Sequence, residues 1–493
     1  MRLVELIMRN WIRHPLNVAV IDDRRRWRGV TLWAASRHIA RAIEQASGSP
    51  RVGVMLPTSG ATMATFAATW LLGRTCVPLN YLLAREELEY VIEHAGLDVV
   101  VTAGPMLERF GDMPKGVKTI RLEEQSFRGV PPLFRGQKRR DDHVAVILYT
   151  SGTSGKPKGV MLTTGNLMAN VDQVRNWVNF TPKDCFVSAL PQFHSFGFTV
   201  MTVLPAVIGC KAIYTARFSP QRVLELMQEH RPTAFMAIPS MYAALLHAKS
   251  GTPDHFTSLR YMVSGGEPLP DAVYDGYQDR YNVRLCEGFG MTETSPVTHW
   301  CRPQEERRGS IGMPMEGVEQ RIVDSDGKVL GPDTDGELQL RGDNIMAGYF
   351  RDQESTDKAI IDGGWLRTGD MARQDAQGFT SITGRIKEML IIGGENVFPR
   401  EIEEVLVRHP AVSMAAVIGV ADPSRGEVAL GFVECVPGET VEPAALRTFC
   451  RDALAGYKVP REIRILDSLP KGPTGKVLRR SLNADSGLGG TAS

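Results

Sequence analysis

The sequence lacks the features that mark several large classes of protein. Its 57 Lys and Arg residues nearly balance 56 Asp and Glu, and the net charge of +1 excludes the basic bias of a nucleic-acid-binding protein. Its seven cysteines are odd in number and form no CxxC pair, so neither a disulfide framework nor a zinc site is indicated. We expect a cytoplasmic protein that binds no nucleic acid and whose cysteines are small buried side chains.

An apolar leader is also missing, and there is only one long uncharged stretch. The N-terminus, MRLVELIMRNWIRHP, carries charges throughout, which argues against a signal peptide. Residues 185–210 carry no formal charge and could span a bilayer by length. Pro191, Gln192, His194 and Pro205 within them disfavour a lipid-exposed helix. We therefore expect buried core and no transmembrane segment, while peripheral contact with a membrane stays open.

What is present is an alternation of apolar strands and helix-like segments. The β-branched runs at residues 52–56, 98–102 and 144–150 are typical of strands buried on both faces. Helical spacing between such runs predicts an α/β fold with largely parallel sheets. Residues 104–140 have the composition of a linker, hairpin-like strands begin near residue 317, and a small α+β unit follows residue 384. At 493 residues the chain predicts two or three domains.

One loop, YTSGTSGKPKG at residues 149–159, has the composition of a phosphate-binding loop. Its glycines allow close backbone approach, and its hydroxyls and lysines add donors and positive charge, which together can cradle a polyphosphate. It is not a Walker A loop, because Pro157 follows the lysine and a strand comes next instead of a helix. A P-loop phosphotransferase is thereby disfavoured. A flexible surface hairpin is the plain alternative, since Gly, Ser and Lys are ordinary turn residues.

Seven segments in order resemble the adenylate-forming (AMP-binding) superfamily, and within it the acyl-CoA synthetase or fatty-acid–CoA ligase branch. They cover nearly the whole chain, and any one of them alone would be weak. The segments are YTSGTSGKPKG (149–159), LPQFHSFG (190–197), SGGEPLP (264–270), EGFGMTET (287–294), WLRTGD (365–370), GRIKEMLIIGGENVFPREIE (384–403) and LPKGPTGKVLRR (469–480).

The resemblance implies an α/β fold in several parts. Residues 1–384 would form a large N-terminal adenylation domain of stacked αβ sheets with a small β-barrel-like part, holding ATP and the acyl pocket. Residues 385–387 would be a hinge with Lys387 at its pivot, and residues 388–482 a small mobile α+β domain. We expect residues 483–493, rich in Gly, Ser and Ala, to be a disordered tail.

The resemblance also implies which residues bind ATP and Mg²⁺. Glu293 is a hard oxygen ligand suited to Mg²⁺, together with the Thr150 hydroxyl, and Phe289 offers a flat platform for adenine. The plain alternatives are a solvated carboxylate, core packing and, for Asp370 with Arg385, an interdomain ion pair. The predicted ATP-binding set is Thr150, Ser151, Gly152, Thr153, Ser154, Gly155, Lys156, Gly266, Glu267, Glu287, Gly288, Phe289, Gly290, Thr292, Asp370, Arg385 and Lys476.

The catalytic residues implied are Lys476, His194, Thr292 and Glu293. Lys476 would neutralise the α-phosphate and the carboxylate as the adenylate forms, since lysine is a mobile point charge; an exposed tail lysine is the alternative. His194 would line the junction of the acyl and thiol tunnels, although a lone histidine among apolar residues is usually a core residue. The predicted acyl pocket is Phe193, His194, Phe198, Gly265 and Val297, an apolar set that suits a fatty or aryl acid.

The second half-reaction implied by the resemblance needs a thiol. The C-terminal domain would rotate after adenylation, and Gly393 and Gly394 would let the pantetheine arm of CoA pass close to the backbone; a simple β-turn is the alternative. The expected reaction is acid, ATP and CoA giving acyl-CoA, AMP and pyrophosphate with Mg²⁺, the acid being a fatty acid. An acyl-carrier-protein ligase or an aryl-CoA ligase stays open, as do a homodimer and, from another class, an inactive binding protein.

Overall fold

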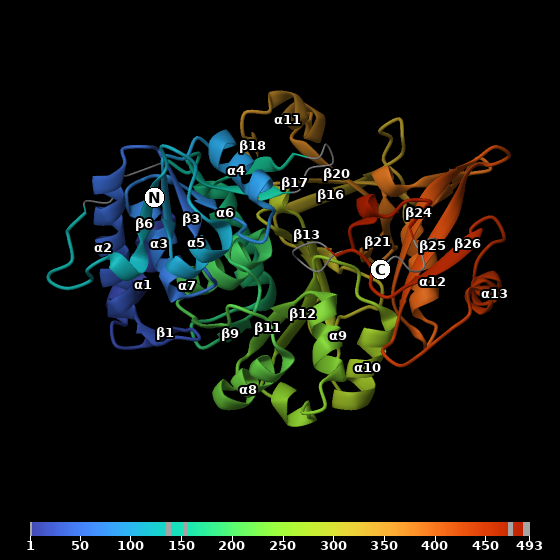
Figure 1. Cartoon of the computed structure of the whole chain (residues 1–493), viewed down its shortest axis with the longest axis horizontal. Helices are drawn as coiled ribbons and strands as arrows, with labels where there is room; N and C mark the ends of the chain where they lie inside the picture. The colour runs from blue at the N-terminus through green and yellow to red at the C-terminus, as the bar shows by residue number, and fades with distance from the viewer. Residues whose placement is uncertain (1, 135–139, 151–155, 472–476, 487–493) are drawn as a thin grey trace.

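A computed structural model describes residues 2–134, 140–150, 156–471 and 477–486. Two large αβ sheets form most of the N-terminal part (Figure 1). In each sheet the central strands are parallel to one another. Antiparallel pairs lie at both edges of the first sheet and at one edge of the second. The first sheet runs, in spatial order, β15 (Met313–Pro314), β14 (Val297–Trp300), β13 (Cys286–Gly290), β12 (Tyr261–Gly265), β11 (Ala234–Ala237), β9 (Cys185–Ser188), β10 (Lys211–Tyr214), β1 (Val18–Ile21) and β2 (Arg26–Arg28).

The second sheet contains the strands on either side of the phosphate-binding loop. β7 and β8 pair antiparallel, with Thr150 opposite Lys158, so the loop connects two neighbouring strands as the sequence predicts. The spatial order is β18 (Gly348–Tyr349), β8 (Lys158–Thr163), β7 (Val144–Thr150), β4 (Thr75–Pro78), β3 (Arg51–Met55), β5 (Val99–Thr102) and β6 (Lys118–Arg121).

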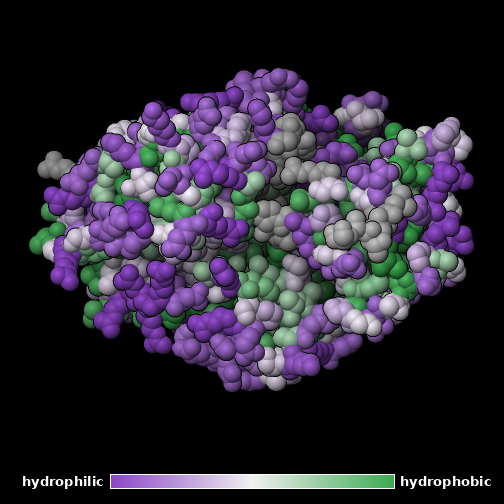
Figure 2. Space-filling model, in the orientation of Figure 1, coloured by the Kyte–Doolittle hydropathy of each residue, from purple (hydrophilic) through white to green (hydrophobic). Residues whose placement is uncertain are grey.

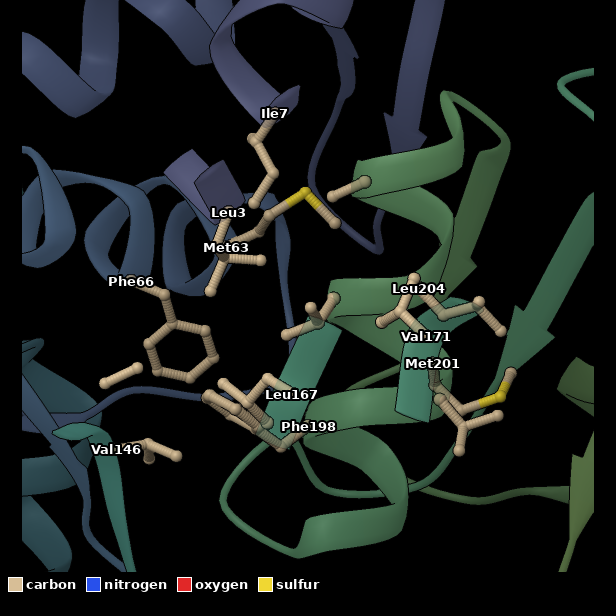
Figure 3. Packing of buried hydrophobic residues seen from close by; sticks show 14 of the residues in the cluster. Leu3, Ile7, Met63, Phe66, Val146, Leu167, Val171, Phe198, Met201 and Leu204 are labelled. Atoms are coloured by element: carbon tan, nitrogen blue, oxygen red, sulfur yellow. The ribbon is translucent and has the colours of Figure 1, made fainter. Parts of the chain in front are cut away.

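Helices pack on both sheets and fill the space between them. The core between the sheets joins side chains of α1, α3, α6 and the π-helix after β9 (Figure 3). The helices of this part are α1 (Arg2–Arg13), α2 (Gly29–Ala46), α3 (Gly60–Leu71), α4 (Arg85–His94), α5 (Gly104–Phe110), α6 (Thr164–Val178), the π-helix η2 (Phe196–Val203), α7 (Leu204–Ile208), α8 (Pro220–His230), α9 (Pro239–His247), α10 (Asp271–Tyr281) and α11 (Gln353–Ala359), with short 3₁₀ turns η1 (Leu122–Glu124), η3 (Pro253–Phe256) and η4 (Thr292–Thr294).

The long uncharged stretch is protein core. It forms β9, η2 and α7, and almost every side chain of η2 is buried. Within the described parts of the chain, no helix is both long enough and apolar enough to cross a membrane. The prediction of a linker at residues 104–140 was wrong in its first half, because α5 packs there and β6 extends the second sheet. A four-residue strand between Gly- and Pro-rich segments carries too little periodicity to be recognised.

A third, antiparallel sheet links the N-terminal part to the C-terminal unit. Its strands are β16 (Val318–Val323), β17 (Gly336–Gly342), β20 (Trp365–Gln374), β19 (Ile360–Ile361) and β21 (Thr380–Arg385). The turn η5 (Ile386–Glu388) leads from β21 into the C-terminal sheet of β23 (Glu395–Val397), β22 (Leu390–Ile392), β25 (Gly426–Cys435), β24 (Val412–Asp422) and β26 (Glu462–Leu466), with α12 (Pro399–Val407), α13 (Pro443–Ala453) and η6 (Arg479–Ser481).

The junction between the two parts is packed rather than open. A Cβ at Gly384 would lie 2.3 Å from the Phe398 side chain and would clash with it. Glycine at this position therefore allows Phe398, the residue before α12, to pack against β21. The Arg400 guanidinium of α12 donates to the Ile382 carbonyl at 2.5 Å. Beyond Leu482, residues 483–486 form a turn to which Arg464 donates, so this part of the predicted disordered tail is ordered; residues 487–493 lie outside the described residues.

Candidate functional site

A cavity of about 2490 Å³ lies where the sheets of the N-terminal part meet the C-terminal unit. Its wall combines the ends of β7, β12 and β13 with β20, β21 and the first turns of α12. The predicted residues that line it are Thr150, Phe193, His194, Gly265, Gly266, Glu267, Glu287, Gly288, Phe289, Gly290, Thr292, Glu293, Val297, Asp370, Arg385 and Lys387. Segments far apart in the sequence therefore meet at one site.

Glu293 is held in place by a residue that the sequence analysis missed. The Tyr349 hydroxyl donates to Glu293 Oε1 at 2.9 Å, and burial followed by the Glu293 charge raises the pKa of Tyr349, which keeps the phenol protonated as a donor. Tyr349 lies on β18, which pairs with β8 directly after the phosphate-binding loop. The carboxylate and the loop are thus part of one framework. Tyr349 lies in none of the seven sequence motifs, so its role becomes visible only in the structure.

Thr292 is likewise tied to a second motif. Its hydroxyl donates to Ser195 Oγ at 3.2 Å, and both side chains are buried. Ser195 follows His194 in the LPQFHSFG segment, which therefore lies directly against the TET turn. A Cβ at Gly197 would come within 2.1 Å of the Pro191 carbonyl oxygen, so glycine is what allows this segment to turn so tightly. The half-buried His194 is thereby placed on the cavity wall.

One carboxylate oxygen of Asp370 has no partner among the described residues and would suit a ligand with hydroxyl donors. Its Oδ1 accepts from Arg385 Nε at 2.9 Å, whereas the buried Oδ2 has no hydrogen-bond partner among the described residues. Burial raises the pKa of Asp370 against the opposing charge of Arg385. A buried acceptor left unpaired is costly, and vicinal hydroxyls such as those of ribose would satisfy it. The site therefore fits a nucleotide.

Glu287 is the second buried carboxylate at the cavity. Burial raises its pKa to about 7, although the Arg400 cation and the N–H groups of Leu269 and Gly309 oppose that change. Arg400 belongs to α12 of the C-terminal unit, so the charge of this carboxylate depends on where that unit sits. Lys387, on η5, has its pKa lowered by burial and by Arg385.

Phe289, the predicted platform for adenine, packs against a buried histidine. Phe289 and His299 face each other across β13 and β14, with ring centroids 6.1 Å apart in an edge-to-face arrangement. His299 Nε2 lies 2.6 Å from Gln320 Oε1, and burial lowers the pKa of His299 to about 4. The imidazole is therefore neutral, so the ring behind Phe289 carries no charge at neutral pH.

The two ends of the phosphate-binding loop are held by aromatic side chains of α4. Tyr149 OH lies 2.8 Å from His94 Nδ1, and the Lys156 ammonium lies 5.4 Å from the centroid of the Tyr90 ring. Tyr90 and His94 stack on each other at 5.4 Å. Burial lowers the pKa of His94, which favours the neutral ring that accepts from Tyr149. This pair forms one platform beneath both ends of the loop.

The two lysines of the loop have different surroundings. Lys156, predicted to bind ATP, does not line the cavity and instead lies over Tyr90. Lys158 lines the cavity, donates to Ser355 Oγ at 2.5 Å and lies 3.7 Å from Asp352. The binding-site prediction named Lys156 and did not include Lys158, because spacing alone does not show that Lys158 lies on the cavity wall. Six predicted residues lie outside the described residues, namely Ser151, Gly152, Thr153, Ser154, Gly155 and Lys476. Two residues near Lys476 in the sequence, Lys471 and Val477, line the cavity.

The structure corrects the acyl-pocket prediction for Phe198. This ring is fully buried in the core between the sheets, 5.0 Å from the Phe66 ring and 6.1 Å from the Trp70 ring (Figure 3). Its position in η2 points it away from the cavity that Phe193 and His194 line. Gly393 and Gly394 also lie off the cavity, in the exposed turn between β22 and β23 with φ of +64° and +89°.

A divalent cation would find no ready-made cluster of protein ligands among the described residues of this cavity. Among the described residues no three His, Cys, Asp or Glu side chains come together as a metal site. Mg²⁺ commonly binds through one or two carboxylates plus substrate phosphates and water, and Glu293 on the cavity wall fits that pattern. The residues present therefore suit a cation that arrives with a nucleotide.

Comparison with known proteins agrees with this geometry. The model of the AMP-binding enzyme family matches residues 8–350, and that of its C-terminal domain matches residues 401–476. Sulfoacetate–CoA ligase of Cupriavidus necator is 34% identical over 445 residues, covering 87% of this chain and 86% of that protein. Long-chain-fatty-acid–CoA ligase of Bacillus subtilis is 32% identical over 484 residues, covering 88% and 85%.

A solved structure gives the same result. The o-succinylbenzoate coenzyme A synthetase of Bacillus subtilis, in complex with ATP and a magnesium ion, has a TM-score of 0.86 and 30% identity, covering 97% of this chain and 98% of that one. The chain belongs to the AMP-binding enzyme family, and to its AMP-forming acyl- and aryl-CoA ligases. The predicted superfamily, fold class and enzyme class are confirmed. ATP, Mg²⁺ and CoA are confirmed for the family.

Replacing Tyr90 tests the predicted contact of Lys156 with ATP. A Tyr90→Leu variant removes the ring beneath the ammonium, and we expect KM for ATP to rise about two- to fivefold, the scale of one exposed cation–π contact. KM for the acid should stay unchanged. Tyr90→Phe keeps the ring and should behave as the wild type. In a Lys156→Met background Tyr90→Leu should add nothing; additive effects of the two changes would show that Tyr90 acts by another route.

Phe198 and Phe193 should differ sharply when each is truncated. Phe198→Ala empties part of a closed core and should lower the free energy of unfolding by about 3–5 kcal/mol, with unchanged preference among acids. Phe193→Ala, at the cavity wall, should change that preference at a smaller cost in stability. Denaturant unfolding and an acid-dependent pyrophosphate assay measure the two properties. An altered acid preference in Phe198→Ala would restore the original pocket prediction.

Proposed function

We propose that this protein activates an apolar carboxylic acid, of the fatty-acid type, as its acyl-adenylate and transfers the acyl group to the thiol of CoA. The observation that carries the proposal is the meeting, on one cavity wall, of the half-satisfied Asp370 carboxylate, Glu293 and an apolar pocket. Side chains that give the pocket its apolar character are Phe193, Phe196, Met236, Ile238, Met241 and Val297. An aryl acid would suit the same side chains, and an aryl-CoA ligase is the nearest alternative.

In the first half-reaction the carboxylate of the acid attacks the α-phosphorus of ATP, and pyrophosphate leaves. Asp370 accepts from the ribose, Phe289 supports the adenine, and Gly266, Glu267, Gly288 and Gly290 bring backbone close to the nucleotide. Glu293 and Thr150 would hold Mg²⁺, which supplies charge neutralisation to the phosphates when bound. Thr292 orients the AMP phosphate. Lys476 supplies the positive charge at the reacting phosphate, so that two anions can approach each other.

In the second half-reaction the thiol must reach the carbonyl next to His194. The Gly393–Gly394 turn lies off the cavity in the present arrangement, so its predicted role with CoA requires the C-terminal unit to turn about Lys387. The junction contacts of Arg400 and Phe398 would then break. Closing the adenylate away from water between the two steps protects it from hydrolysis.

The mouth of the cavity favours CoA, or another phosphorylated pantetheine thiol, as the acceptor. Arg109 and Arg217 line the cavity, and neither guanidinium makes an ion pair with any residue that the structure describes. Both lie near Tyr81, whose ring packs edge-on against Phe193 at 4.9 Å. Burial raises the pKa of Tyr81 and the two arginines oppose that change. Exposed guanidinium groups on a cavity wall, with no ion-pair partner among the described residues, suit phosphate groups. A carrier-protein acceptor remains the second candidate.

The reaction is tested by pyrophosphate release with ATP, Mg²⁺ and single acids from acetate to palmitate, with benzoate and coumarate included. We expect release with the longer fatty acids and little with acetate. Lys476→Ala should lose this release yet still convert a supplied acyl-adenylate into thioester, because its charge serves only the first step. If no acid elicits release while ATP binds, the chain is a binding protein; equal loss of both steps in Lys476→Ala would contradict the two-state mechanism.

The acceptor is tested with a series of thiols. Replacing Arg109 and Arg217 together by Ala should raise KM for CoA about tenfold, the scale of one or two lost charge-assisted hydrogen bonds, and leave KM for pantetheine unchanged. Pyrophosphate release should stay at the wild-type rate. Arg451→Ala, an exposed arginine on α13, is the control. Equal KM for CoA and pantetheine in the wild type would refute the assignment, and turnover with holo-carrier protein alone would favour the second candidate.

A further inference from the structure

Exposed aliphatic side chains gather on one end of the N-terminal part. Two segments carry them, the end of α1 with the turn after it, and residues 126–134 after η1. Ile12 is 54% exposed, Leu16 70%, Val130 88% and Leu133 86%. Soluble surfaces expose single apolar residues routinely, but several grouped large ones indicate a contact surface.

Both segments contact the same helix, α2, and therefore belong to one surface. At the N-terminal end of α2, the Val30 N–H donates to the Pro15 carbonyl at 2.9 Å. Farther along the helix, Arg37 Nη1 donates to the Pro132 carbonyl at 2.9 Å, and the His38 ring lies 6.2 Å from the Phe127 ring. Figure 1 shows α1, α2 and this loop at the end of the molecule opposite β24–β26, and hydrophobic patches interrupt the hydrophilic surface at that margin in Figure 2.

Positive charge accompanies these side chains. Residues 1–50 contain nine arginines and four acidic residues, a net +5 in a chain whose total is +1. Exposed arginines of this end that make no ion pair with the described residues are Arg13, Arg28, Arg41 and Arg128. With Ile12, Leu16, Val130 and Leu133 they form what we term the basic apolar face.

We propose that the basic apolar face docks the protein on the surface of an anionic lipid bilayer. Aliphatic tips enter the boundary between head groups and acyl chains, and arginines meet the negative surface potential, which is the usual pairing of forces at such interfaces. The proposal adds an interaction to the ligase reaction and does not depend on which acid or thiol is used.

Two other occupants fit the face less well. A second copy of the chain in a two-fold dimer would place the same positive surface against itself, where like charges repel. A carrier protein is acidic enough to bind arginines, but it must also insert its thiol arm. Neither α2 nor residues 126–134 line the cavity, so a carrier protein bound on this face would lie away from the site that its arm must enter.

Vesicle flotation of the full chain tests the proposal. Wild type should float with phosphatidylcholine vesicles that contain phosphatidylglycerol, remain unbound with phosphatidylcholine alone, and be released by high salt. Changing Val130→Asp and Leu133→Asp together should lower vesicle binding at least tenfold. Val329→Asp is the matched control, because Val329 is an exposed valine (57%) outside this face. Arg13→Glu with Arg128→Glu should also lower binding, whereas Arg451→Glu should not.

Pyrophosphate release by each variant in solution serves as the folding check, so a failure of the ligase reaction is seen separately from a failure to bind lipid. Absence of wild-type flotation with the anionic vesicles would overturn the proposal. So would wild-type binding by the Val130→Asp, Leu133→Asp variant. If light scattering finds a dimer that this variant dissociates, and vesicles are not bound, the face is a self-interface and the lipid assignment is wrong.

Discussion

A carboxylate removed from water must be paired, protonated or supplied with donors, and this constraint shapes the centre of the molecule. Asp370 meets it in part, because one oxygen accepts from Arg385 and the other has no hydrogen-bond partner in the part of the chain that the structure describes. The strand pairing of β20 and β21 places these two residues opposite each other, so the ion pair belongs to the sheet and is present before any ligand. The other oxygen of Asp370 then requires only a hydrogen-bond donor. The nucleotide-binding role that we propose for Asp370 therefore rests on an ion pair that the fold itself provides.

Much of this arrangement could be predicted from the chain alone, because the motifs carry their own chemistry. Glu293, Thr292, Phe289 and Asp370 lie in segments whose order identifies the superfamily, and the structure brings them to one wall. The alternation of apolar runs likewise predicted an α/β fold with largely parallel sheets. Short-range patterns sufficed wherever the informative residues stand next to each other in sequence.

The errors arise where position depends on rotation or on distant partners. Phe193 and Phe198 are similar residues five apart, and the π-helix that begins at Phe196 decides that only the first reaches the cavity. The prediction also left out Lys158, whose place on the cavity wall depends on its hydrogen bond to Ser355 of α11. Tyr349 lies 56 residues from its partner Glu293. Such pairings leave no local trace in a single sequence.

Arg400 connects the position of the C-terminal unit to the protonation of the N-terminal part. Its cation helps to keep Glu287 ionised, and even so the pKa of that carboxylate is about 7. Glu404, on the same helix, raises that pKa, so two charges of α12 act on Glu287 in opposite directions. The protonation of a buried carboxylate in one part of the chain is thus tied to the position of a helix from the other part, and the junction between them is sensitive to pH.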